Sequence, residues 1–118
     1  STIAGAVKAA TAHNKGVVVD LIGVADKVSR AKEARALGAR FIEFHAGLDE
    51  QALPGYNLNV LLGAGEEARV PFSVAGGVNL STIGAVQRAG ADVAVVGGSI
   101  YSAEDPALAA KELKAAII

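Results

Sequence analysis

Short apolar segments alternate with helical segments along the whole chain, and this alternation limits the fold more than any other feature. Segments rich in valine, isoleucine and phenylalanine predict four strands, at residues 17–22, 41–45, 72–75 and 93–97. Apolar residues at helical spacing predict five helices, at residues 2–13, 26–37, 58–68, 81–89 and 105–118. Residues 48–52 are compatible with one further turn of helix. Strands joined by helical crossovers imply an α/β fold with a parallel sheet.

Capping residues support these boundaries. Asp26 is expected to cap the second helix and Asp105, followed by proline, the last one. Gly38 and Gly90 stand where a helix ends. The sequence around these two glycines is also repeated, since LGARF at 37–41 matches AGADV at 89–93 at an offset of 52, or two units of about 26 residues.

Two architectures satisfy this pattern. One is a small open doubly wound sheet that is complete with four strands, as in flavodoxin-like domains, and the other is part of a closed (β/α)8 barrel. A barrel of this kind usually takes about 250 residues, so 118 residues are close to half of one. Residues 1–118 are then expected to form a single half-barrel domain. Its unpaired edge strands favour self-association, as a homodimer or a higher assembly.

Composition excludes several function classes. Net charge is −1, with 52% apolar and 19% charged residues, so neither a nucleic-acid surface nor disorder is expected. The chain has no cysteine, which removes disulfides and thiolate chemistry. No apolar run reaches the roughly 18 residues of a membrane helix. A cytoplasmic location is therefore expected.

Polar side chains at strand ends are the candidates for chemistry. Glu43 and His45 share one face of their strand, and Asp20 ends an otherwise apolar strand, where a carboxylate needs a partner. We favour a functional role for His45 and Asp20. A structural role is favoured for Glu43, which is expected to satisfy a lysine or backbone groups. His13, at the end of the first helix, is expected to be structural.

Two glycine turns each join a strand to a helix. They contain Gly76 and Gly77, and Gly97 and Gly98. Bare backbone amides at such turns can approach an anion, and (β/α)8 enzymes often bind phosphate after their last two strands. Tight turns that need a positive φ are the alternative explanation, but it is less suited to two turns in successive units.

Four segments carry a resemblance to a known family: VDLIG at 19–23, FHAGLDEQ at 44–51, VAGGV at 74–78 and GGSIY at 97–101. The chain resembles the 3-hexulose-6-phosphate synthases of the orotidine monophosphate decarboxylase suprafamily over its whole length. The resemblance implies the C-terminal half of a (β/α)8 barrel. It also implies an aldehyde-lyase that joins formaldehyde to ribulose 5-phosphate through a magnesium-bound enediolate.

Four positions separate these synthases from the sibling 3-keto-L-gulonate-6-phosphate decarboxylases, which would carry Glu, Arg, Thr and Arg. In this chain the four are Asp20, Leu48, Ala75 and Gly98, which resembles the synthase. The resemblance implies that His45 moves a proton and that Asp20 orients polar substrate atoms. It places Leu48 and Ala75 in the substrate pocket and gives phosphate binding to the amides of Gly76, Gly77, Gly97 and Gly98.

One family motif is missing. The resemblance implies an Asp-x-Lys-x-x-Asp motif that supplies the magnesium-side carboxylates and a lysine, and this chain does not contain it. No residue of the chain is therefore expected to bind the metal, and His45 is expected to lack a partner. The chain alone is expected to be inactive. A non-catalytic phosphate-binding half-barrel and a decarboxylase relative stay open as alternatives.

Overall fold

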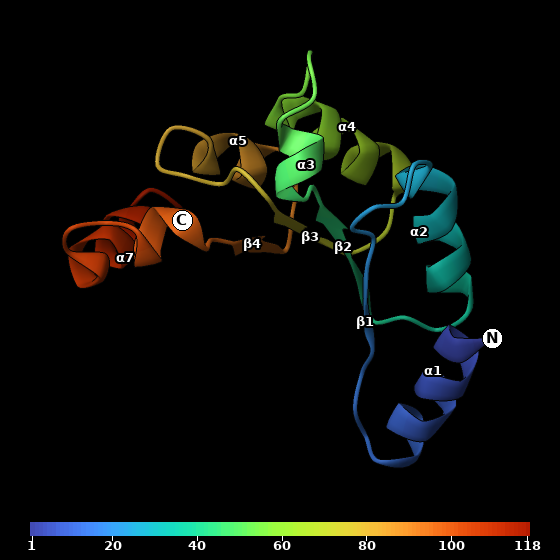
Figure 1. The fold of residues 1–118 in the computed structure, drawn as a ribbon. Helices are drawn as coiled ribbons and strands as arrows, with labels where there is room; N and C mark the ends of the chain where they lie inside the picture. Colours follow the sequence, from blue (N-terminus) through green and yellow to red (C-terminus); the bar gives the residue numbers. More distant parts are fainter.

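The computed structural model describes residues 1–118, which form one parallel sheet covered by helices (Figure 1). The strands are β1 (Val18–Asp20), β2 (Phe41–His45), β3 (Phe72–Ala75) and β4 (Val93–Val95), in the order β1-β2-β3-β4. Crossovers between parallel strands are right-handed, so a sheet that always grows in one direction collects its helices on one face. This is the arrangement of a (β/α)8 barrel and excludes a doubly wound sheet, whose strand order reverses. The half-barrel prediction is confirmed.

Seven helices accompany the strands. They are α1 (Thr2–Ala12), α2 (Lys27–Ala36), α3 (Leu48–Gln51), α4 (Leu58–Ala68), α5 (Ile83–Arg88), α6 (Gly98–Tyr101) and α7 (Pro106–Ala115). The five longer ones are those predicted, and α3 is the expected single turn. The prediction missed α6, because four residues are too few to show helical periodicity. The Asp26 and Asp105 caps are confirmed, since their carboxylates accept from the amides of Ser29 and Leu108.

Some predicted boundaries are too wide. The edge strands β1 and β4 each pair with one neighbour only, and both are three residues long. Helix α5 begins at Ile83 and not near residue 81, because the side chain of Asn79 accepts from the amides of Ser81 and Thr82. That side chain builds a turn in place of the first predicted helical residues.

The core lies between the sheet and the helices. On the helix-facing side, Ile42, Phe44 and Val74 are fully buried, and Phe44 packs edge-on against Phe72 with ring centroids 5.7 Å apart. Helix α4 adds Leu61 and other apolar side chains to this layer. Strand alternation therefore directs Glu43 and His45 to the opposite face of β2.

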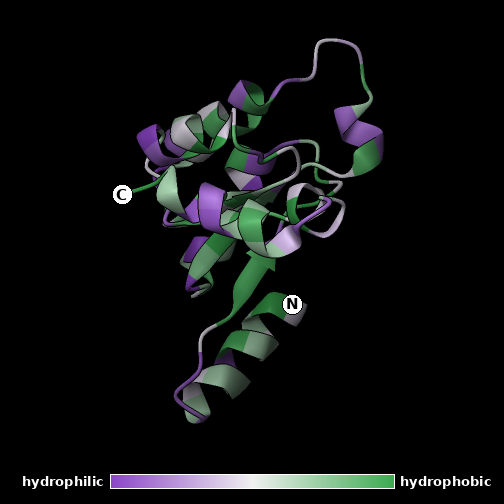
Figure 2. Ribbon diagram, turned by 90° about the vertical axis from the view of Figure 1, so that its left-hand side faces the viewer, coloured by the Kyte–Doolittle hydropathy of each residue, from purple (hydrophilic) through white to green (hydrophobic).

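That opposite face and both sheet edges are open. Val18 at one edge and Val93 and Val95 at the other are 40–45% exposed. Helix α1 lies at one end of the molecule, below α2 in the view of Figure 1, and has no buried residue (Figures 1 and 2). None of the helices combines the length and the apolar character needed to cross a membrane.

Candidate functional site

The carboxyl ends of the parallel strands meet at one edge of the sheet, and a cavity of about 630 Å³ opens there. It is lined by the ends of β2, β3 and β4 and by the turns that follow them. Seven of the eight site residues predicted from the sequence lie around it: His45, Leu48, Ala75, Gly76, Gly77, Gly97 and Gly98. The eighth, Asp20, does not line the cavity but contacts His45 directly. The structure thus brings all eight together, while their roles stay predictions.

His45 has a carboxylate partner. Its Nδ1 lies 3.0 Å from Asp20 Oδ2 and 3.2 Å from Oδ1. The carboxylate is itself fixed, because Asp20 Oδ1 accepts from the amide of Ile22 at 2.9 Å. The expectation that His45 lacks a partner is therefore wrong. A carboxylate at Nδ1 favours a proton on that nitrogen and leaves Nε2 as the free nitrogen of a residue that lines the cavity.

Glu43 lies between the two neighbouring strands. It stands in register with Asp20 on β1 and with Ser73 on β3, and Ser73 Oγ donates to Glu43 Oε1 at 3.3 Å. The expected lysine or backbone partner is wrong, because the strand register places a serine there. Glu43 Oε2 is 3.7 Å from His45 Nδ1. Burial, and then the charge of Asp20, raise the pKa of Glu43 above its usual value.

This raised pKa has a consequence for stability. The folded chain holds the Glu43 proton more tightly than the unfolded chain, whose glutamate titrates near 4.5. The stabilisation is therefore complete below that pH and is lost as the pH rises through the folded pKa. Glu43→Gln, which resembles the protonated acid, is expected to raise the melting temperature by a few degrees at about pH 7 and hardly at all at about pH 3.5. Thermal unfolding followed by circular dichroism measures both values.

Glu67→Gln is the matched control, because Glu67 is exposed on α4 and forms no ion pair. It is expected to change the melting temperature little at either pH. An equal gain for Glu43→Gln at both values, or a loss at neutral pH, would contradict the electrostatic explanation.

Asp20, Glu43 and His45 form the one cluster that could hold a metal ion, with ligand atoms all within 4.8 Å of one another. Magnesium prefers about six oxygen ligands in octahedral geometry. The cluster offers two carboxylates and an imidazole whose Nδ1 already contacts Asp20, so by itself it does not fit magnesium. The prediction that this chain supplies no magnesium ligand stays a prediction.

The two glycine turns lie next to each other at the mouth of the cavity. Gly76 and Gly77 have φ values of 101° and 89°, a region that only glycine adopts readily. The amides of Gly76, Gly77 and Gly97 donate to no protein group. Ser99 Oγ, in α6 after the second turn, donates to the carbonyl of Val78 after the first at 3.2 Å. Unpaired amides from two adjoining turns are suited to an anionic ligand.

Sequence reasoning did not single out Gln51 and Tyr101, which also line the cavity, and it included Ser99 only as the last residue of the second glycine turn. Gln51 and Tyr101 each end a segment that carried the family resemblance, and Ser99 lies inside one. Membership of those segments, and of the second glycine turn for Ser99, was the only signal available, because the contacts of these side chains depend on how separate turns meet.

The fold is that of part of a (β/α)8 barrel, and the candidate site lies at the carboxyl ends of its strands. The model of the Orotidine 5'-phosphate decarboxylase / HUMPS family matches residues 1–113. The chain belongs to that family.

Comparison with individual proteins gives a narrower match than the family as a whole. The chain is 76% identical over 117 residues to the 3-hexulose-6-phosphate synthase of Mycobacterium gastri, covering 99% of this chain and 56% of the relative. Identity to the synthase of Methylomonas aminofaciens is 44%, covering 95% and 54%. The chain thus spans about half the length of the curated relatives it matches.

Solved structures show the same similarity to 3-hexulose-6-phosphate synthases. A crystal structure of 3-hexulose-6-phosphate synthase superposes with a TM-score of 0.95 at 75% identity, covering 99% of this chain and 56% of that one. The synthase from Salmonella typhimurium gives a TM-score of 0.87 at 33% identity, covering 98% and 56%. A Streptococcus mutans protein described as KGPDC, at 23% identity and a TM-score of 0.72, supports the fold alone.

Proposed function

We propose that this chain is the C-terminal half of a 3-hexulose-6-phosphate synthase, an aldehyde-lyase that condenses formaldehyde with ribulose 5-phosphate to 3-hexulose 6-phosphate. The observation that carries the proposal is one cavity lined by the two glycine turns and by His45, whose Nδ1 contacts Asp20. Leu48, Ala75 and Gly98 line the same cavity and have the synthase identities expected at these positions. The 76% identity to a synthase supports the same reaction.

Each part of the cavity has a proposed role. Unpaired amides of the glycine turns bind the phosphate of the sugar and so fix the distance from that end to the reacting carbons. His45 moves a proton at the carbon chain, a task suited to an imidazole near neutral pH. Asp20 holds Nδ1 and thereby presents Nε2. Leu48 and Ala75 shape the pocket, and the magnesium of the full-length family is assigned to residues outside this chain.

A chimera tests the proposal. This chain replaces the matching part of the Mycobacterium gastri synthase, and the consumption of formaldehyde is measured with ribulose 5-phosphate and magnesium. We expect activity within about tenfold of the parent enzyme, because the chain is 76% identical to the part that it replaces. A folded chimera that binds ribulose 5-phosphate but does not consume formaldehyde would contradict the proposal. The same chimera without ribulose 5-phosphate serves as the control.

The alternative is a phosphate-binding half-barrel without catalysis. It is favoured by one observation, that both glycine turns are complete within this chain while both sheet edges are unpaired. It predicts that the chain alone binds phosphate esters without magnesium and self-associates through β1 and β4. Sedimentation at several concentrations, together with a phosphate titration with and without magnesium, separates it from the enzyme proposal.

A further inference from the structure

The connection between β2 and α4, residues 46–57, packs against the turn that contains Gly76 and Gly77. Tyr56 Oη donates to the carbonyl of Gly76 at 3.2 Å. Gln51 Nε2 donates to the carbonyl of Ala46 at 2.9 Å, and a side chain at Gly76 would collide with that same carbonyl. One side of the turn therefore packs directly against this connection. Only the opposite side of the turn is free to contact a ligand.

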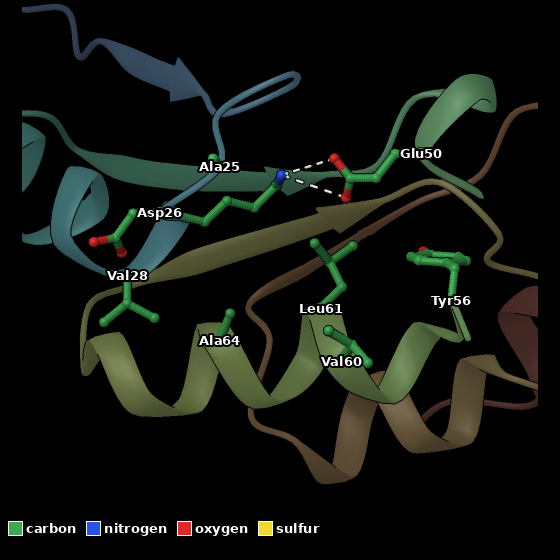
Figure 3. A pocket seen from close by; sticks show the side chains of 9 residues that line it. Ala25, Asp26, Val28, Glu50, Tyr56, Val60, Leu61 and Ala64 are labelled. Atoms are coloured by element: carbon green, nitrogen blue, oxygen red, sulfur yellow. Dashed lines mark hydrogen bonds and ion pairs between the residues drawn. The ribbon is translucent and has the colours of Figure 1, made fainter. Parts of the chain in front are cut away.

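The connection is anchored on the outer side of the sheet. Lys27, only 8% exposed at the start of α2, donates to Glu50 Oε1 at 3.0 Å and to the carbonyl of Val24 at 2.8 Å. Figure 3 shows this ion pair and Tyr56 around one small cavity between α2 and α4. An ion pair shielded from water on one side is less screened than one on the open surface. It holds the segment that carries Tyr56 against the body of the protein.

The hydrogen bond from Tyr56 to the Gly76 carbonyl also restrains the peptide group between Gly76 and Gly77. In a trans peptide the carbonyl of one residue and the amide of the next lie in one plane and point in opposite directions. When Tyr56 holds the Gly76 carbonyl on the side of the connection, the Gly77 amide must point to the other side. That amide has no protein acceptor, and Gly77 lines the large cavity.

Glycine makes such a restraint necessary. Two consecutive glycines at positive φ can rotate the peptide group between them at little steric cost, so the backbone alone does not fix the direction of the amide. We propose that Tyr56 is a positioning residue that fixes the Gly76–Gly77 peptide with its amide toward the bound phosphate. This inference rests on the phosphate site proposed above and extends it to a residue outside the cavity.

The protonation state of Tyr56 agrees with this role. Burial, and then the nearby charge of Glu50, raise the pKa of Tyr56 above its usual value near 10. The phenol therefore stays protonated, and remains a hydrogen-bond donor, throughout the neutral range.

The test removes only the hydroxyl group. Tyr56→Phe is compared with the unmodified chain by amide NMR while inorganic phosphate is titrated in. We expect the carbonyl carbon of Gly76 and the amide of Gly77 to shift before phosphate is added, and phosphate binding to weaken about five- to tenfold, the effect of one lost hydrogen bond. Leu53→Ala is the matched control, because Leu53 lies in the same connection and its side chain is 60% exposed.

Three outcomes of this experiment would contradict the proposed role of Tyr56. Unchanged Gly76 and Gly77 signals with unchanged phosphate affinity in Tyr56→Phe would overturn the role of Tyr56 and leave the phosphate site intact. Equal weakening by Leu53→Ala would also overturn it, because the effect would then come from the connection as a whole. If phosphate does not perturb the turn amides of the unmodified chain, the phosphate site itself is wrong, and the role of Tyr56 is wrong with it.

Discussion

Replacing His45 with glutamine in the chimeric barrel is expected to lower the rate of formaldehyde consumption by about two to four orders of magnitude, the usual contribution of a positioned acid–base group. Glutamine fills similar space and can still contact Asp20, but it cannot exchange a proton near neutral pH. Binding of ribulose 5-phosphate is expected to change less than the rate, because the phosphate contacts come from backbone amides. Steady-state kinetics with a separate binding measurement check both expectations.

Two comparisons make this result specific. Asp20→Asn keeps the shape of the partner and removes its charge, so a smaller loss of rate is expected, since His45 keeps its nitrogen atoms but loses the carboxylate at Nδ1. His13→Gln is the control, because His13 only caps α1 and is exposed. A His45→Gln chimera that keeps more than about a third of its activity would contradict the acid–base role.

Local patterns were enough to predict the α/β class and the order of strands and helices. The alternation of apolar strands and helices depends on side-chain periodicity, and the Asp26 and Asp105 caps depend on neighbours within three residues. The choice between an open sheet and a half-barrel was not local, because it depends on strand order. Residue patterns alone left it open, and the resemblance and then the β1-β2-β3-β4 order decided it.

The candidate site could be predicted residue by residue but not contact by contact. Strand-end positions and glycine turns identified His45, Asp20 and the four glycines, and the family resemblance added Leu48 and Ala75. The structure places all eight residues together. Their partners were not predictable in the same way. Asp20 reaches His45 from a strand 25 positions away, and Ser73 reaches Glu43 from 30 positions away. Tyr56 showed no signal at all, because its contact with Gly76 exists only once two loops are packed.

Substitution by valine is expected to affect folding stability much more at Gly76 than at Gly98, although both were assigned to phosphate binding on the same grounds. Gly76 has a φ of 101°, and a side chain there meets the Ala46 carbonyl, so Gly76→Val is expected to destabilise the chain by roughly 2 to 4 kcal/mol. At Gly98 the nearest atom to an added Cβ is Tyr101 Oη at 3.8 Å. Gly98→Val is therefore expected to change the free energy of unfolding by less than about 1 kcal/mol.

Phosphate binding and folding stability are expected to be lost together in Gly76→Val, whereas Gly98→Val is expected to lose phosphate binding alone. Because Gly98 lines the cavity and has room for a side chain, its valine projects where the phosphate is proposed to bind and weakens phosphate binding by about tenfold or more in a chain that still folds. Gly76→Val loses binding together with the fold. Urea unfolding and a phosphate titration on both variants test this, with Gly63→Val on α4, where nothing approaches an added Cβ, as a control outside the cavity. A Gly98→Val chain that binds phosphate as the unmodified chain does would exclude the second glycine turn from the site, since the added side chain would then share no space with the ligand.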